Sequence, residues 1–273
     1  MGEQYTYARF WRCALQVNPV GYNSSYRGVD HGLDECSYNQ ALLQKCLELD
    51  IKVVGLADHG NVASVDTLRQ LLREHGIVLF PGFEIASNDK THYVCLFPED
   101  TTVQQLERYL GRLELCDPAD GIRPSQLSSE KLIEEVDRLG GFIYAAHCTQ
   151  ENGLLKNRLD HVWKHPKLRA AQIPGSIDDL AGVEDGFYRR VFLNKDDNYR
   201  RERPVAAINA KDVAKPNDLD HPSATCLVKM TRPTFAAFKV AFLDPISRVR
   251  LNSQQAPSPI GKIVRMTVDG GYL

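Results

Sequence analysis

The chain has 273 residues, an apolar fraction of 43% and a formal charge of −2, which allow one large or two modest domains and exclude a globally basic nucleic-acid-binding protein. Its 7 cysteines form no C-x-x-C pair, which argues against a disulfide scaffold or zinc ribbon and for a reducing compartment. Without a visible signal peptide or membrane-spanning run, we expect a cytoplasmic protein with no membrane contact.

Hydrophobic periodicity predicts strands that alternate with helices along most of the chain. In chain order, we predict strands at 12–17, 52–57, 77–80, 91–97, 142–146, 169–173, 204–209 and 224–230, and helices at 39–49, 64–75, 102–115, 129–139, 154–164 and 235–242. Thr102-x-x-Gln105 has the spacing of a capping box at the start of the third helix. The alternation favours a mostly parallel sheet or a β/α barrel.

The composition of the chain changes after Arg250. Residues 252–259 form a linker rich in Ser, Gln and Pro, and residues 263–268 resemble a lone strand. A strand with nothing after it to pair with indicates that a further domain has been cut away. We therefore divide the chain into a barrel domain at 1–251 and a remnant at 252–273.

Polar residues follow four of the predicted strands. Asp58 and His59 follow the strand at 52–57, and Glu84, His147 and Asp212 follow three later ones. In a β/α barrel the carboxyl ends of the strands meet at one mouth, where the chemistry is built. The sequence therefore predicts one site assembled from several strands.

These residue types favour a metal site. Glu84, His92 and His147 are the strongest set, because carboxylate and neutral imidazole suit zinc, manganese or iron. The residues that could supply a second ion or reach the same rim are Asp58, His59, Asp212 and His31. Metal clusters of this kind hydrolyse phosphate esters by activating a water and neutralising phosphoryl charge.

Other interpretations of single residues stay open. His92 also fits a structural histidine on a strand, and Asp58-His59 also fits a helix N-cap followed by a surface ring. Asp212 also fits a turn, and Cys148 fits packing better than ligation. The remaining histidines are interpreted as surface or turn residues: His75, His161, His165 and His221.

Two segments interleave aromatic residues with arginines. They are Tyr188-Arg189-Arg190 and Tyr199-Arg200-Arg201. Arg189, Arg190, Arg200 and Arg201 are therefore candidates for gripping a nucleic-acid backbone. A solvated charged loop is the alternative explanation.

Several short motifs, in order, resemble the PHP (polymerase and histidinol phosphatase) superfamily. They are 56–60 (Leu-Ala-Asp-His-Gly), 81–84 (Pro-Gly-Phe-Glu), His92 before 96–98, and 145–147 (Ala-Ala-His). The stretch 229–251 resembles the end of the PHP domain in proteins that fuse it to an SMC/ABC-type ATPase, such as the TrlF-type proteins and the Ppl-type anti-phage defence proteins.

The resemblance implies a distorted (β/α)7 barrel that holds up to three divalent ions, followed by a C-terminal strand of an ATPase lobe that is absent here. It also implies phosphoester hydrolysis, DNA as a partner, the ATPase domain as a partner in the same polypeptide, and a homo-oligomer. ATP would bind only through the absent domain, because this chain has no G-x-x-x-x-G-K-[ST] loop.

The chain departs from the family pattern at two motifs. Gln16 and Asn18 stand where the first motif has two histidines, and Lys211-Asp212-Val213-Ala214 stands where the last has Ser-Asp-Ala-His. Amide oxygens are weak ligands, so Mg²⁺ or Mn²⁺ becomes more plausible than trinuclear zinc. Lys211 adds a positive charge that replaces part of the lost metal charge or holds a phosphate.

Two main hypotheses follow for function, and a small-molecule phosphatase stays open as a third. The first is a metal-dependent nuclease that acts on foreign, phage DNA, with Asp58, His59 and Lys211 as catalytic residues. The second is a degenerate PHP domain that acts as a regulatory module and binds a nucleotide or a protein partner. The surviving Glu84, His92 and His147 favour the first, and the lost histidines favour the second.

Overall fold

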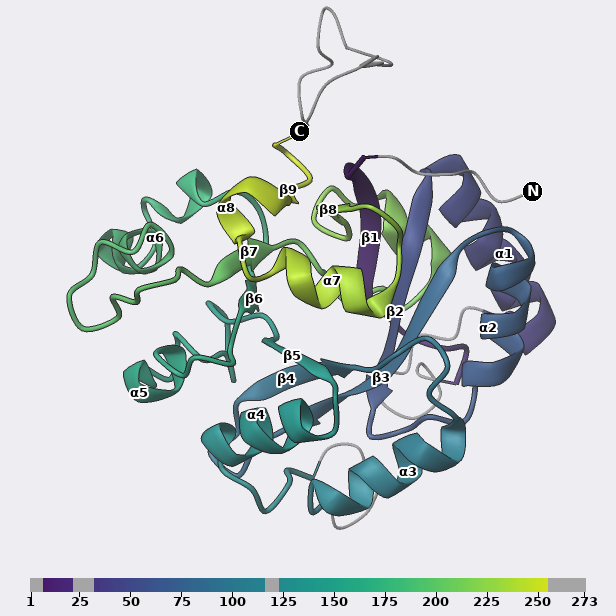
Figure 1. Cartoon of the computed structure of the whole chain (residues 1–273), viewed down its shortest axis with the longest axis horizontal. Helices are drawn as coiled ribbons and strands as arrows, with labels where there is room; N and C mark the ends of the chain where they lie inside the picture. Colours follow the sequence, from purple (N-terminus) through teal and green to yellow (C-terminus); the bar gives the residue numbers. More distant parts are fainter. Residues whose placement is uncertain (1–6, 22–31, 116–122, 255–273) are drawn as a thin grey trace, which may run out of the picture.

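A single sheet organises the molecule. The computed structural model describes residues 7–21, 32–115 and 123–254. Within these residues the sheet has nine strands in the order β7-β6-β5-β4-β3-β2-β1-β8-β9 (Figure 1). The strands are β1 (Arg9–Val17), β2 (Ile51–His59), β3 (Val78–Ala86), β4 (His92–Leu96), β5 (Phe142–Ala145), β6 (Ala170–Gln172), β7 (Ala206–Ile208), β8 (Cys226–Met230) and β9 (Val249–Leu251).

The sheet curls until its two edges nearly meet. β9 lies beside β7, and the backbone N–H of Asn252 donates to the side-chain oxygen of Asn209 at 3.0 Å across this seam. The α/β class and the nearly closed, barrel-like sheet are thus confirmed. The number of β/α units expected, seven, and the division at residue 252 stay predictions, because residues 255–273 lie outside the described part, as does the strand expected at 263–268.

The expectation of a mostly parallel sheet is only half correct. β1, β2 and β3 pair in parallel, as do β5, β6 and β7, but β4 runs antiparallel to both of its neighbours. β8 is antiparallel to β1 and to β9. The reason at β4 is the connection: five residues separate it from β3, which suffice for a hairpin, whereas a parallel crossover needs a dozen or more.

Helices cover the outside of the sheet and one end of the barrel. They are α1 (Glu35–Glu48), α2 (Val65–Glu74), α3 (Val103–Arg112), α4 (Ser129–Arg138), α5 (Asp160–Trp163), α6 (Phe187–Phe192), α7 (Phe235–Ala241) and α8 (Pro245–Arg248). The capping box predicted at Thr102 and Gln105 is present. The helix expected at 154–164 is wrong for its first half: α5 is a single turn, and Arg158 before it adopts a φ of +58°. Every helix among the described residues is too short or too polar to span a lipid bilayer.

Two apolar cores lie on the two faces of the sheet. The outer core packs helices against strands, and the inner core fills the barrel. α7 closes the end at which the parallel strands begin: Phe235 and Phe238 contact Phe80 with ring centroids 5.1 and 5.2 Å apart, and Phe238 contacts Phe142 at 5.0 Å. The opposite end of the barrel is left open.

Candidate metal centre

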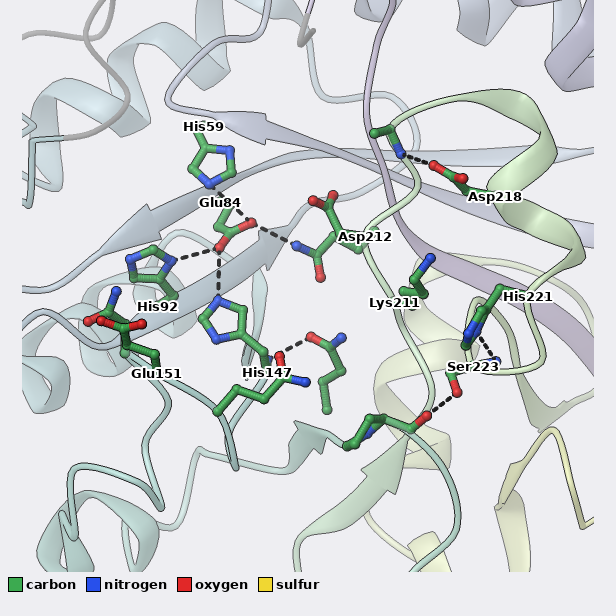
Figure 2. Close-up of a pocket in the computed structure, with 16 residues that line it drawn as sticks. His59, Glu84, His92, His147, Glu151, Lys211, Asp212, Asp218, His221 and Ser223 are labelled. Carbon is green, nitrogen blue, oxygen red and sulfur yellow. Dashed lines mark hydrogen bonds and ion pairs between the residues drawn. The ribbon is translucent and has the colours of Figure 1, made fainter. Parts of the chain in front are cut away.

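The open end of the barrel holds a cavity of about 600 Å³. Its walls come from the carboxyl ends of β1, β2, β3 and β6, from the first residue of β4, and from the loops that follow β5, β6 and β7 (Figure 2). It is lined by Gln16, His59, Glu84, His92, His147, Gln150, Glu151, Asn152, Gln172, Pro174, Lys211, Asp212, Ala214, Asp218, His221 and Ser223. Residues far apart in the sequence therefore meet in one cavity, as the strand-end pattern predicted.

Glu84 lies at the centre of this cluster. Its side chain is on the inner face of β3, and the residue is only 3% exposed. One carboxylate oxygen lies 3.0 Å from Nδ1 of His92 and 3.6 Å from Nε2 of His147. The other accepts a hydrogen bond from Nε2 of Gln16 at 2.7 Å and lies 3.6 Å from Nε2 of His59. Three imidazoles thus converge on one buried carboxylate.

Glu84 is a carboxylate at neutral pH. Burial raises the pKa of this group, but hydrogen bonds from His147 and His92 and the charge of His59 outweigh burial and bring the pKa well below its ordinary value. Burial of a carboxylate is costly unless hydrogen-bond donors or a cation lie beside it. The Glu84 carboxylate therefore favours the binding of a positive charge at this point of the cavity.

The β3–β4 hairpin places His92 beside Glu84. Ala86 pairs with His92 at the end of the hairpin. The side chains of His92 and Glu84 therefore lie near the same rim of the barrel. Close packing of the two strands requires Gly82, because a Cβ there would overlap the carbonyl oxygen of Cys95. The turn between the strands is tied by Asp89, which accepts from the Ser87 hydroxyl at 2.6 Å.

His147 is held in a strained backbone conformation. Its φ is +27°, which non-glycine residues rarely adopt. The backbone N–H of His147 donates to Oε1 of Gln172 at 2.7 Å, and a Cβ at Gly153 would overlap the His147 carbonyl oxygen. Strain of this kind clusters at functional sites, where the surrounding contacts fix it.

Asp58 and His59 point to different places although they are neighbours. Successive side chains of a strand alternate between faces, and only His59 lines the cavity. Asp58 is 6% exposed and accepts from the backbone N–H of His59 at 2.7 Å. Burial, together with the carboxylates of Asp212 and Glu84, raises the pKa of Asp58 to about 6. The structure thus does not place the predicted ligand Asp58 among the cavity-lining residues.

Of the two residues assigned to the first motif, Gln16 lines the cavity and Asn18 does not. The pairing of β1 with β2 is irregular between Ala14 and Val17, and Gln16, within this stretch, lines the cavity. Oε1 of Gln16 is buried and has no hydrogen-bond partner among the described residues. Asn18 is 1% exposed, does not line the cavity, and donates from Nδ2 to the Asp212 carboxylate. His31 lies outside the described residues.

The predicted nucleic-acid contacts lie away from this cavity. None of the four arginines lines it. Arg189 pairs with Asp178 at 3.0 Å, and Arg200 lies 3.3 Å from Asp197. Arg190 donates to a backbone carbonyl at 2.7 Å. These three side chains are well exposed, so their role in nucleic-acid binding stays a prediction.

Arg201, by contrast, is half-buried against main-chain carbonyls. Its guanidinium donates to the backbone carbonyls of Trp163 and Arg203. Burial lowers the pKa of Arg201 to about 10. A guanidinium committed to two main-chain carbonyls in a half-buried position is poorly placed to contact phosphates.

Sequence reasoning missed several cavity residues. They are Gln150, Glu151, Asn152, Gln172, Asp218, His221 and Ser223. His221 does sit in a turn, as predicted, but it also lines the cavity. Its position ten residues after Lys211, in the loop that follows a site strand, was the available signal. Gln172 ends β6, a strand for which no terminal polar residue was considered.

The donor set fits a divalent metal. His59, Glu84 and His92 each offer a ligand atom, and these atoms lie within 4.8 Å of one another. Two imidazoles with a carboxylate suit zinc, manganese or iron, and the partnerless Gln16 oxygen adds a neutral donor at the same wall. The ligand roles of the individual residues remain predictions.

No protein-family model and no curated protein matches this sequence. Solved structures share the fold. A lesion-specific endonuclease from Pyrococcus furiosus aligns with a TM-score of 0.58 at 13% identity, over 85% of this chain and 55% of its own length. Endonuclease Q in complex with a 27-mer duplex that carries an abasic lesion also gives 0.58 at 13% identity, over 89% of this chain and 58% of that protein.

A two-domain protein from Bacteroides vulgatus that contains a predicted PHP-like metal-dependent phosphoesterase aligns with a TM-score of 0.52 at 12% identity. The alignment covers 89% of this chain and 64% of that protein. This chain thus spans between about half and two thirds of the length of these structures. At such low identity the likeness establishes the fold alone, an α/β barrel-like fold shared with these proteins.

Proposed function

We propose that this chain is a metal-dependent phosphoesterase that cleaves DNA. The observation that carries the proposal is the buried Glu84 carboxylate, on which His59, His92 and His147 converge inside an open cavity. A purely structural cluster has no need of a 600 Å³ opening above it. The fold shared with a lesion endonuclease supports the same conclusion.

Each part of the cavity has a role in this proposal. His59, Glu84, His92, His147 and Asp212 would hold the metal. A divalent ion there supplies a Lewis acid that polarises a phosphoryl oxygen and lowers the pKa of a water. Gln16 orients Glu84 through its 2.7 Å hydrogen bond, and Gln172 fixes the backbone of His147. Lys211 lines the cavity and contributes positive charge toward the substrate.

We further propose foreign, phage DNA as the substrate and an SMC/ABC-type ATPase as a domain of the same polypeptide, assembled as a homo-oligomer in the cytoplasm. The support is the resemblance of 229–251 to such fusions. A structural neighbour crystallised on duplex DNA adds to the case for a DNA substrate. ATP would then be bound by that domain and not by the barrel.

Metal analysis of the purified chain is the first test. We expect Mn²⁺ or a transition metal to bind, and Glu84→Ala to reduce the metal content. The enzyme proposal fails if no such metal binds with useful affinity and if Glu84→Ala leaves the metal content unchanged.

Cleavage of DNA is the second test. Linear, nicked and single-stranded DNA would be incubated with the chain in Mn²⁺ or Mg²⁺, and we expect cleavage that His147→Ala abolishes. His161→Ala is the matched control, because His161 is 57% exposed in its side chain and does not line the cavity. Equal loss in both variants would point to damage to the fold instead of the site.

A regulatory module is the second candidate. The specific observation in its favour is the hydrogen bond that the Gln16 amide donates to Glu84. In the family that the sequence resembles, a metal-binding histidine stands at the position of Gln16. A module of this kind would bind a nucleotide or a partner in the cavity without cleaving it. Cleavage that depends on His147 would rule this candidate out.

A further inference from the structure

The wall of the cavity that faces the histidines is formed by the loop after β7. Figure 2 shows Lys211, Asp218, His221 and Ser223 on this side, across from His59, His92 and His147. Lys211 and His221 both line the cavity, and neither belongs to the cluster around Glu84. A site for phosphate esters needs hydrogen-bond donors on a second wall as well, because the transferred phosphoryl group carries several oxygens.

Main-chain hydrogen bonds fix this loop. The backbone N–H of Lys211 donates to the Ser223 carbonyl at 2.8 Å, which ties the two ends of the loop together. The Ser223 hydroxyl donates to the carbonyl of Pro174. The backbone N–H of Val213 donates to the carbonyl of Gln16 at 3.0 Å, which ties the loop to β1. The backbone positions of Lys211 and His221 on the rim are therefore fixed.

The contact of His221 with Ser223 decides the tautomer of the imidazole. The backbone N–H of Ser223 donates to Nδ1 of His221 at 3.1 Å. A backbone N–H is always a donor, so Nδ1 is an acceptor and the hydrogen of the neutral ring is on Nε2. Nδ1 is thus occupied and Nε2 carries a hydrogen, so His221 offers no lone pair to a metal. It offers one neutral N–H donor instead.

The ammonium group of Lys211 is available for a ligand. Among the described residues, it makes no ion pair or hydrogen bond. The cavity is nevertheless acidic, with four carboxylates (Glu84, Glu151, Asp212 and Asp218) against this one lysine. An anion will therefore enter only when a divalent cation offsets the carboxylates. Asp218 is partly satisfied already, because its carboxylate accepts from the backbone N–H groups of Ala214 and Lys215 at 3.1 Å.

We infer that Lys211 and His221 form the phosphoryl-binding side of the site, with the Lys211 ammonium and the neutral His221 Nε2–H donating to non-bridging phosphate oxygens. This inference rests on the proposed function for its substrate class. It assigns His221 as a donor to substrate and excludes it as a substitute for the histidine missing from the last motif.

Inorganic phosphate is the probe for this site. Its affinity would be measured by calorimetry on the chain loaded with Mn²⁺ and on the metal-free chain, with metal content determined in parallel. We expect binding to the loaded chain alone. Lys211→Met and His221→Ala should each weaken it about 10- to 100-fold, the usual effect of losing a hydrogen bond to a charged group, at unchanged metal content. His221→Gln, which keeps a neutral N–H donor, should restore much of the affinity.

Matched controls separate this site from general damage. Lys215→Met changes an exposed lysine of the same loop that does not line the cavity, and His161→Ala changes a distant surface histidine. Both should bind phosphate as the unchanged chain does. The inference is overturned if the loaded chain does not bind phosphate, if Lys211→Met and His221→Ala bind it normally, or if His221→Ala removes metal.

The proposed function and this inference can fail separately. If the unchanged chain binds no metal or does not cleave DNA, the proposed function is contradicted. Normal metal content with phosphate affinity that is indifferent to both residues contradicts the inference alone.

Discussion

The two ends of the barrel interior are built from the same strands and differ in chemistry. On β3, Phe80 and Glu84 lie four residues apart on the same inner face, and both are nearly fully buried. Phe80 meets the rings of α7 at the closed end. Glu84 meets Gln16 and the histidines at the open end. One end buries apolar surface, and the other buries charge.

The difference teaches where stability and function lie in this molecule. Burial of aromatic rings in edge-to-face contact is a direct gain in free energy of folding. Burial of a carboxylate is costly unless donors and cations surround it. The open end therefore needs a reason other than stability, and the proposed metal centre supplies one.

The largest expected effect is at the closed end. Phe238→Ala removes a fully buried ring that contacts Phe80 and Phe142, and we expect a loss of about 3–5 kcal/mol in the free energy of unfolding. Denaturant unfolding measures it. Phe10→Ala, at a half-buried position beside Lys229 and Arg250, should cost less, about 1–2 kcal/mol. Metal content of the folded Phe238→Ala chain should stay normal, and a loss there would break the separation of the two ends.

Glu84→Gln should have the converse effect. The substitution removes the central charge of the open end, so we expect metal affinity to fall at least about 100-fold, as measured by titration with Mn²⁺. Glu151→Gln is the control, because Glu151 lines the same cavity but is exposed. Equal affinities for the two variants would contradict the central role of Glu84.

Gln172→Ala tests the support of His147. The change leaves the His147 backbone N–H without its 2.7 Å acceptor and allows the strained φ to relax. We expect metal affinity to fall about 10-fold, which is typical when a group that orients a ligand is lost. Gln150→Ala lies in the same cavity without this contact and should stay within about twofold. Unchanged affinity in Gln172→Ala would show that His147 needs no such support.

The smallest effect is expected at the β3–β4 turn. Burial raises the pKa of Asp89, but hydrogen bonds from Ser87, Ser129 and Thr91 outweigh it, so the pKa is lowered in the folded state. A lowered pKa means that this carboxylate stabilises the fold above its unfolded pKa, near 4, and that the gain is lost as the pH falls through the folded pKa.

Asp89→Asn should therefore destabilise the fold by about 1 kcal/mol at pH 7, after allowance for its half-exposed position, and by little near pH 2. Denaturant unfolding at the two pH values measures this. Asp197→Asn, at a side chain that is 89% exposed, should have little effect at either pH. An Asp89→Asn effect that is independent of pH would contradict the electrostatic account.

Local patterns predicted most elements and much of the cavity. Apolar runs followed by Glu84 and His147 led to the open end, because strand direction places such residues at one rim. The direction of β4 was missed although the short connection before it excludes a crossover. Adjacent strand residues point to opposite faces, so only His59 of the pair lines the cavity, and the ligand role of Asp58 stays a prediction. The charge pattern along the sequence did not show that the Arg201 guanidinium is half-buried against main-chain carbonyls, and its role in nucleic-acid binding stays a prediction.

By itself, the sequence determined the order of the strands along the chain and the residues at their ends, since these depend on periodicity and residue type. Only the tertiary structure decided that His59 enters the cavity and Asp58 does not, and that Gln16 bonds to Glu84. It also decided that the backbone N–H of Ser223 makes His221 a donor. Those outcomes depend on which groups from distant segments come within about 3 Å of each other, and that distance is where hydrogen bonds are made.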